Sequence, residues 1–178
     1  MFSIQPCSLP DNALLDSYRA NGAYTDCYAT DIVGSVSHKQ FVTAFYTTSL
    51  FKLERAILNW AVSKPSTDAQ AEQLASGATD AFAAWHVEKR RENQVLMCDF
   101  QGRTRSWLMV APLRSDSGAG TRLYFGSAVV PVKSATGRPK LGLAFRALLG
   151  FHKIYSKALL RAATARLNAQ RTARAGLT

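Results

Sequence analysis

The chain has 178 residues, of which 47% are hydrophobic and 19% are charged. This composition is ordinary for a globular protein of one domain, and it excludes a chain that is disordered throughout. No apolar run reaches the roughly 18 residues that a membrane-spanning helix needs, because Arg146 and Lys153 interrupt the longest candidate. We expect one domain over residues 1–178, with a basic tail over 171–178.

The net charge of +10 comes from the end of the chain. All 12 acidic residues lie at or before Asp116, whereas residues 133–178 carry ten cations and no acidic residue. Such a segment attracts anionic surfaces, such as lipid headgroups, nucleic acid or acidic proteins. Lys and Arg on a solvent-exposed helix face can also serve only to keep a protein soluble. The sequence does not distinguish this role from the binding of an anionic surface.

The start of the chain and its cysteines predict a cytoplasmic location. The first twelve residues have neither the basic region nor the long apolar region of a signal peptide. Cys7, Cys27 and Cys98 are odd in number and have no metal-binding spacing, so we expect reduced thiols and no bound metal. Nucleotide-binding and nucleophile motifs are also missing from the sequence, and we expect no cofactor.

The first half of the chain predicts one strand followed by helices. Residues 23–33 are rich in Tyr, Thr and Val, which is typical of a strand. Ser37 and Gln40 have the spacing of a capping box, which marks the start of a helix. A run of Thr and Ser near residue 48 breaks this helix, and a second helix ends at Pro65. We expect the residues up to 79 to form a loop or a short helix.

From residue 80 onward the hydrophobic pattern has a period of two. Short turns join four such segments, so neighbouring strands must be antiparallel and form a meander. Pro112 lacks a backbone N–H, and we expect a bulge or an early end of pairing there. The four predicted strands lie within residues 80–90, 94–101, 104–114 and 121–133.

A long amphipathic helix is predicted from residue 141 to about residue 170. Its apolar residues follow one another at spacings of four and three, which places them on one side of the helix. They are Leu141, Phe145, Leu148, His152, Tyr155, Leu159 and Ala162. The opposite side carries Arg146, Lys153, Lys157 and Arg161. Because the sheet needs a cover for its apolar face, we expect the helix to dock there.

This order of elements resembles the START-like, polyketide-cyclase-like superfamily (SRPBCC), whose α+β fold is called helix-grip. In that fold a curved antiparallel sheet wraps a long C-terminal helix. The resemblance in topology covers residues 24–170. A motif of uncharacterised bacterial members, a Gly-Arg turn before a helix with the pattern pFHr.I, is matched by Gly137-Arg138 and by residues 151–154. Seven strands are usual in the superfamily, and we place the two further short strands between residues 64 and 80.

The resemblance implies a ligand cavity between the sheet and the C-terminal helix. We expect it to bind a small hydrophobic or aromatic, lipid-like molecule, because aromatic and Met side chains suit such ligands. The predicted ligand-binding residues are Phe100, Trp107, Met109, Tyr124, Phe145, Leu148, His152 and Tyr155.

Two further functions stay open from the sequence. A cyclase, dehydratase or hydrolase could use the same cavity, with His152, Tyr155 or Arg105 as the candidate catalytic residue. A core histidine that only bonds a backbone carbonyl or a tyrosine is the alternative for His152. The basic helix could instead hold the protein to an anionic membrane. We do not expect nucleic acid as a partner, since the sequence has no recognisable nucleic-acid-binding module beside its basic segment. Whether the protein is an enzyme, and its oligomeric state, stay undecided.

Overall fold

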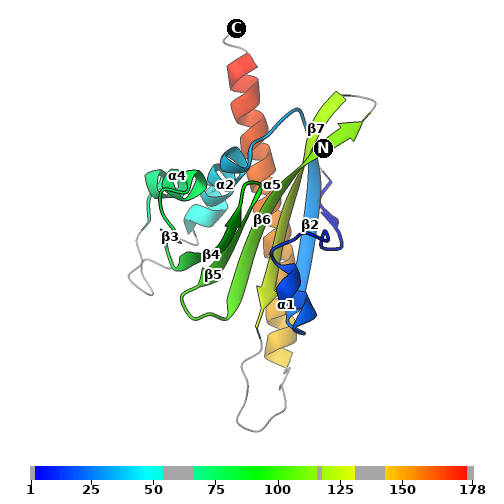
Figure 1. Ribbon diagram of the computed structural model, residues 1–178, viewed down its shortest axis with the longest axis vertical. Coiled ribbons are helices and arrows are strands. Elements are labelled where there is room, and N and C mark those ends of the chain that lie inside the picture. Colours follow the sequence, from blue (N-terminus) through cyan, green and yellow to red (C-terminus); the bar gives the residue numbers. More distant parts are fainter. Residues whose placement is uncertain (1–2, 54–65, 116–117, 131–142, 176–178) are drawn as a thin grey trace.

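The computed structural model of the protein describes residues 3–53, 66–115, 118–130 and 143–175. Its centre is a seven-stranded antiparallel sheet with the strand order β1-β2-β7-β6-β5-β4-β3 (Figure 1). A long helix, α5, lies along one face of this sheet. The elements are β1 (Gln5–Pro6), α1 (Asp16–Ala20), β2 (Tyr24–Val33), α2 (His38–Tyr46), α4 (Asp68–Ser76), β3 (Ala81–Phe82), β4 (Trp85–Arg91), β5 (Gln94–Asp99), β6 (Thr104–Ser115), β7 (Gly118–Val129) and α5 (Leu143–Ala175).

This arrangement confirms the predicted fold class. The fold is α+β, and an antiparallel sheet with a long C-terminal helix on one face is consistent with a helix-grip fold. The strands from β3 to β7 form the predicted meander, and β2 pairs with β7 along its whole length. The second helix predicted to end at Pro65 falls largely outside the described residues.

The short helix that the sequence offers for residues up to 79 is confirmed, and the two further strands do not lie in the described part of this stretch, residues 66–80. That stretch forms α4, which starts at a second capping box made by Thr67 and Gln70 and ends at Gly77 in the left-handed conformation. The two short strands are instead β1 and β3, which form the two edges of the sheet. The predicted capping box of Ser37 and Gln40 is confirmed at the start of α2.

Pro112 lies in the part of β6 that has a partner strand on one side only. Pairing between β5 and β6 ends with Gln94 opposite Met109, so β5 does not extend as far as Pro112. On its other side β6 keeps its register with β7, and Pro112 lies opposite Thr121. A missing N–H is tolerated on a side without a partner strand. The expected early end of pairing is therefore confirmed on the β5 side, and the register shift of the sheet lies in β4 instead.

One face of the sheet, here called the helix face, is covered by α2, α4 and α5 and carries the larger apolar cluster. Aromatic rings fill its α2 end, with centroids between 4.8 and 6.2 Å apart. These rings belong to Phe45, Tyr46, Phe51, Phe82 and Phe125. The candidate site lies on the same face, where β2 and β7 meet α5.

The opposite face, here called the outer face, is covered by residues 9–15 and α1 (Figure 1). Gln94 is fully buried under this cover. Its Oε1 accepts hydrogen bonds from Leu14 N and Trp107 Nε1, both at 2.9 Å, and its Nε2 donates to the Asn12 carbonyl at 3.0 Å. One amide thus fastens the N-terminal segment to the sheet.

The buried side of α5 is rotated by about one residue from the predicted stripe. Its fully buried positions are Ser156, Leu160, Ala163 and Thr164. The predicted position Tyr155 is only partly buried. Thr164 can lie on the buried side because its hydroxyl donates to the Leu160 carbonyl of the same helix at 2.8 Å, whereas Ser156 Oγ has no partner among the described residues. Because the buried side is rotated in this way, His152 lies at the edge of the contact between α5 and the sheet, with 28% of its side chain exposed.

The cationic side of α5 faces solvent at the positions that the structure describes. Three cations that the sequence places opposite the apolar stripe are exposed: Lys153, Lys157 and Arg161. Arg166 is also exposed.

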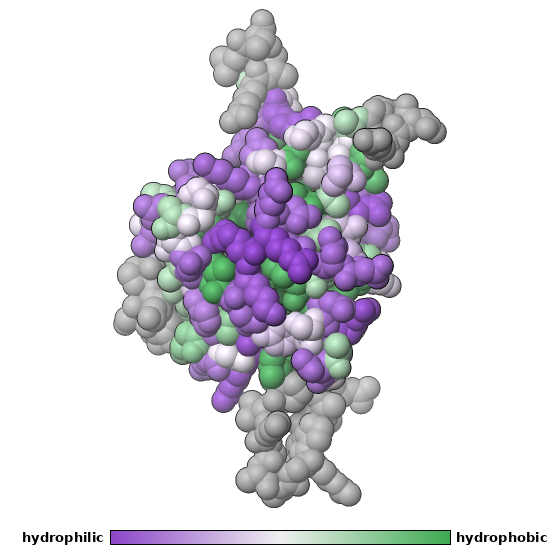
Figure 2. Space-filling view, in the orientation of Figure 1, coloured by the Kyte–Doolittle hydropathy of each residue, from purple (hydrophilic) through white to green (hydrophobic). Residues whose placement is uncertain are grey.

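The outer face of the molecule, shown in Figure 2, is mainly hydrophilic, with hydrophobic side chains in small separate areas. In the described ranges, no helix is long and apolar enough to cross a bilayer.

Candidate functional site

A cluster of three polar side chains lies where β2, β7 and α5 meet. Asp26 near the start of β2 is directly opposite Ser127 near the end of β7, so both side chains point to the same face of the sheet. His152, in the N-terminal half of α5, covers them. Ser127 Oγ is 2.5 Å from Asp26 Oδ1 and 2.5 Å from His152 Nε2, and Ser127 N donates to Asp26 Oδ1 at 3.2 Å.

Hydrogen-bonding rules fix the direction of this chain of bonds. An ionised carboxylate only accepts, so the Ser127 hydroxyl must donate to Asp26. The same hydroxyl oxygen then accepts from His152, whose Nε2 carries a proton in this arrangement. The bonds run from His152 through Ser127 to Asp26, and a proton moving along them would pass from the imidazole to the carboxylate.

The Asp26 carboxylate is buried but not fully paired. Its side chain is 8% exposed, and its Oδ2 has no hydrogen-bond partner among the described residues. This oxygen is 3.7 Å from His152 Nε2, too far for a hydrogen bond. A buried charged oxygen without a donor costs free energy, so Asp26 Oδ2 is an unsatisfied acceptor. His152, the nearest side chain of α5 to this oxygen, is partly exposed.

Two tyrosines extend the site along β2. Tyr24 and Tyr28 alternate with Asp26 and therefore share the helix face. Burial is the main cause that raises the pKa of both phenols, and the negative charge of Asp26 raises them further, for Tyr28 to about 12. Lys157 of α5 lies over the Tyr28 ring, with Nζ 5.6 Å from its centroid. Both phenols thus stay protonated at neutral pH beside the carboxylate.

The geometry differs from that of a serine nucleophile. In a Ser-His-Asp triad the carboxylate orients the histidine, and the histidine takes the serine proton. Here the carboxylate bonds Ser127 itself, and His152 donates to the serine oxygen. The cluster is suited to accepting a hydrogen bond through Asp26 or to moving a proton, and it does not activate Ser127 for attack. Among the described residues, no group of three or more His, Cys, Asp or Glu side chains could hold a metal ion.

The structure places three of the predicted ligand-binding residues on the other side of the sheet. Trp107, Met109 and Tyr124 belong to the outer-face cluster, under residues 9–15. They cannot line a space between the sheet and α5, because the sheet itself lies between. Their neighbours in the strands, Leu108 and Leu123, are the ones that face the helix. The alternation of side chains was predicted correctly, whereas the sequence left open which face of each strand lies toward the helix, and the structure places these three residues on the outer face.

Two more candidates lie away from the cluster. Phe100 follows β5 in a turn and is 52% exposed. Arg105 belongs to the outer face, where its Nε donates to Tyr18 Oη at 2.8 Å and to Glu88 Oε2 at 2.5 Å. Tyr18 in turn donates to Glu88, so the guanidinium has a structural role between α1 and β4. Arg105 is therefore not a partner for His152.

Of the predicted site residues, His152 and Tyr155 lie on the helix face. His152 is part of the cluster described above, and Tyr155 lies partly buried against the main apolar cluster. The side chains of Phe145 and Leu148 fall outside the described residues. Asp26 and Ser127 were not predicted. The sequence signal for Asp26 is an acidic residue that alternates with Tyr24 and Tyr28 inside a strand.

The chain matches no known family profile and no curated protein. The crystal structure of CalU16 from Micromonospora echinospora aligns with 95% of this chain and 94% of its own, at 12% sequence identity and a TM-score of 0.30. The fold assignment given above rests on the strand order and on the position of α5 themselves.

Proposed function

We propose that the protein binds a small, largely apolar molecule on the helix face, between the sheet and the N-terminal half of α5. The observation that carries this proposal is the buried Asp26 carboxylate, whose Oδ2 lacks a partner among the described residues. A ligand hydroxyl that donates to this oxygen would remove the cost of leaving it unpaired. The apolar part of the ligand would lie against Tyr24, Tyr28 and Tyr155.

The charge of Asp26 sets the chemistry of the ligand. A neutral donor, such as an alcohol or a phenol, gains a hydrogen bond to the carboxylate, which is stronger than a bond between neutral groups. A ligand carboxylate at the same place would meet a like charge in a poorly solvated site. We therefore propose a lipid-like or aromatic alcohol, and we do not propose a fatty acid.

Thermal unfolding with matched ligands tests this proposal. Long-chain primary alcohols should raise the melting temperature, by mass action on the folded state, and fatty acids of the same chain length should not. Asp26→Asn should abolish this preference. Asp31→Asn is the matched control, because Asp31 lies in the same strand, is exposed and is bonded to Arg122. Equal shifts with alcohols and acids, or no shift with either, would overturn the proposal.

A second candidate function uses the same cluster as an acid–base catalyst. The bonds from His152 through Ser127 to Asp26 could carry a proton to or from a bound substrate, as a cyclase or dehydratase requires. The geometry favours these over a hydrolase with a serine nucleophile. A fluorophosphonate probe should leave Ser127 unlabelled, whereas stoichiometric labelling of Ser127 would show that it is a nucleophile.

A third candidate is binding to anionic membranes, supported by the exposed cations of α5. Lys153, Lys157, Arg161 and Arg166 are all exposed, and each cation near an anionic surface contributes up to about 1 kcal/mol. Such contact is compatible with a lipid-like ligand and a cytoplasmic protein. Co-sedimentation with phosphatidylserine vesicles should decrease as salt increases. Binding that is absent, or that salt does not weaken, would exclude this role.

A further inference from the structure

Two cysteine side chains meet on the outer face, at the edge of the sheet. β1 pairs with β2 so that Pro6 is opposite Tyr28, and the next pair in this register is Cys7 and Cys27. The backbone confirms the register, because Cys7 N donates to the Cys27 carbonyl at 3.0 Å. The two sulfur atoms are 3.2 Å apart, and both thiols are free.

This geometry suits a disulfide. Directly opposite residues of antiparallel strands have Cα atoms about 4.5 to 5.5 Å apart, inside the range of about 4.4 to 6.8 Å seen for disulfides. The sulfur atoms need to approach from 3.2 Å to about 2.05 Å, which small side-chain rotations provide. Formation of the bond therefore needs no change of register between β1 and β2.

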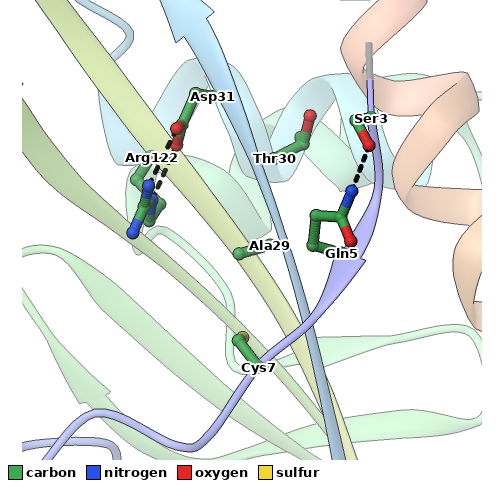
Figure 3. A pocket seen from close by; sticks show the side chains of 7 residues that line it. All are labelled: Ser3, Gln5, Cys7, Ala29, Thr30, Asp31 and Arg122. Atoms are coloured by element: carbon green, nitrogen blue, oxygen red, sulfur yellow. Dashed lines mark hydrogen bonds and ion pairs between the residues drawn. The ribbon is translucent and has the colours of Figure 1, made fainter.

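Only one of the two sulfur atoms is open to a reagent. Cys7 lines a cavity of about 330 Å³ at the edge of the sheet, which β1, β2 and β7 form together (Figure 3). Cys7 itself is partly exposed, whereas Cys27 is buried, with 5% exposure. A small molecule in this cavity reaches Cys7 first, and Cys27 can react only with a group already attached to Cys7.

The charges around the cavity support the same assignment. The hydrogen bond from the Cys27 thiol lowers the pKa of Cys7, burial opposes this effect, and the Arg122 guanidinium lowers the pKa further. The bond to Cys7 and burial raise the pKa of Cys27. Arg122 is held in place by Asp31, with hydrogen bonds of 2.7 and 2.8 Å (Figure 3). The exposed thiol is thus the one that ionises first, as a nucleophile requires.

We propose that Cys7 and Cys27 form a thiol–disulfide exchange site that reacts with low-molecular-weight disulfides. The Cys7 thiolate attacks one sulfur of the reagent, forms a mixed disulfide and releases one equivalent of reagent thiolate. The Cys27 thiol then loses its proton and attacks Cys7 Sγ, which releases the second equivalent. The two cysteines are oxidised to one disulfide, and one reagent disulfide is reduced to two thiols.

Glutathione disulfide tests the proposal on the intact protein. The wild-type chain should lose two hydrogen atoms in mass and yield a cross-linked Cys7–Cys27 peptide. Cys27→Ser should stop at the glutathione adduct on Cys7, and Cys7→Ser should form neither product. Cys98→Ser is the matched control and should react like wild type, because Cys98 is buried and separate from the pair. An adduct mainly on Cys98, or Cys7→Ser that still forms an intramolecular disulfide, would overturn the assignment.

A measurement on the unaltered protein covers the case in which a variant fails to fold. Iodoacetamide followed by peptide mapping should modify Cys7 about tenfold faster than Cys27 and Cys98. Oxidised wild-type protein should melt roughly 5 to 10 °C higher than reduced protein, because the bond closes a loop of about 20 residues. Equal alkylation of the three cysteines, or no change in melting temperature after cross-linking, would contradict the proposal.

Discussion

His38 provides a test of the packing between α2 and the sheet through the effect of pH on stability. It is the first residue of α2 and is 9% exposed. The Leu108 backbone lies close enough to favour the protonated ring, while His38 Nε2 has no partner among the described residues. Burial lowers the pKa of His38 from 6.5 to about 4, against the effect of the Leu108 backbone, and the charge of Arg90 lowers it further. Protonation would place an unpaired N–H⁺ in the core.

The sign of the effect follows from proton linkage. Below pH 6.5 the unfolded chain binds a proton at this position, and the folded chain does not until the pH approaches 4. Stability is therefore complete above pH 6.5 and is lost as the pH falls from 6.5 to 4. At about 1.4 kcal/mol for each pH unit, the full loss is about 3 kcal/mol, of which about 2 kcal/mol is lost by pH 5.

Urea unfolding at pH 7.5 and pH 5 measures this difference. His38→Asn keeps a polar side chain beside the Leu108 backbone but cannot titrate, so its free energy of unfolding should fall by about 2 kcal/mol less than that of wild type. His86→Asn is the matched control, because His86 is exposed, and it should behave like wild type. The quantity to compare is the difference in free energy of unfolding between pH 7.5 and pH 5. The free energy at one pH is not suitable, because the smaller asparagine side chain also weakens packing. An equal pH dependence in wild type and His38→Asn would refute this reasoning.

Three further predictions concern single side chains. Gln94→Met leaves two buried donors unpaired, one of them Trp107 Nε1, and should lower the free energy of unfolding by about 2 to 4 kcal/mol in urea; a loss below about 1 kcal/mol would contradict the role of Gln94. Ser37→Ala removes the capping bond at the start of α2 and should cost about 1 kcal/mol in thermal unfolding, and no loss would mean that the cap is replaced. Arg105→Met breaks bonds on the outer face and should leave binding of long-chain alcohols unchanged, so a loss of binding would argue against separate roles for the two faces.

The fold was predictable where local chemistry is strong. The capping box at Ser37 fixes the start of a helix within the chain itself, and the short turns between the later strands force an antiparallel meander. The edge strands β1 and β3 were not predictable in the same way. Each has two residues, too few to show a period of two, and each exists because a neighbouring strand offers free backbone groups. Tertiary pairing alone determines them.

The face of each strand could not be assigned from the sequence. Strand alternation puts Trp107 and Met109 on one side and Leu108 on the other, and both sets are apolar enough to be buried. The N-terminal segment settles the assignment, because residues 9–15 cover the outer face and allow large side chains there. This irregular stretch, which contains Pro10, gives no signal that it will cover a sheet.

Asp26 and Ser127 are the residues of the proposed site that the sequence did not indicate. Asp26 and Ser127 are 101 positions apart and meet only through the register of β2 with β7. A side chain that served only to bond Ser127 would need one acceptor atom, and an asparagine would supply it without a buried charge. The chain instead keeps a carboxylate whose second oxygen has no partner in the part of the chain that the structure describes. Local departures from good packing are expected at functional sites, and this unpaired oxygen lies beside a histidine that is 28% exposed, where the proposed ligand would supply the missing donor.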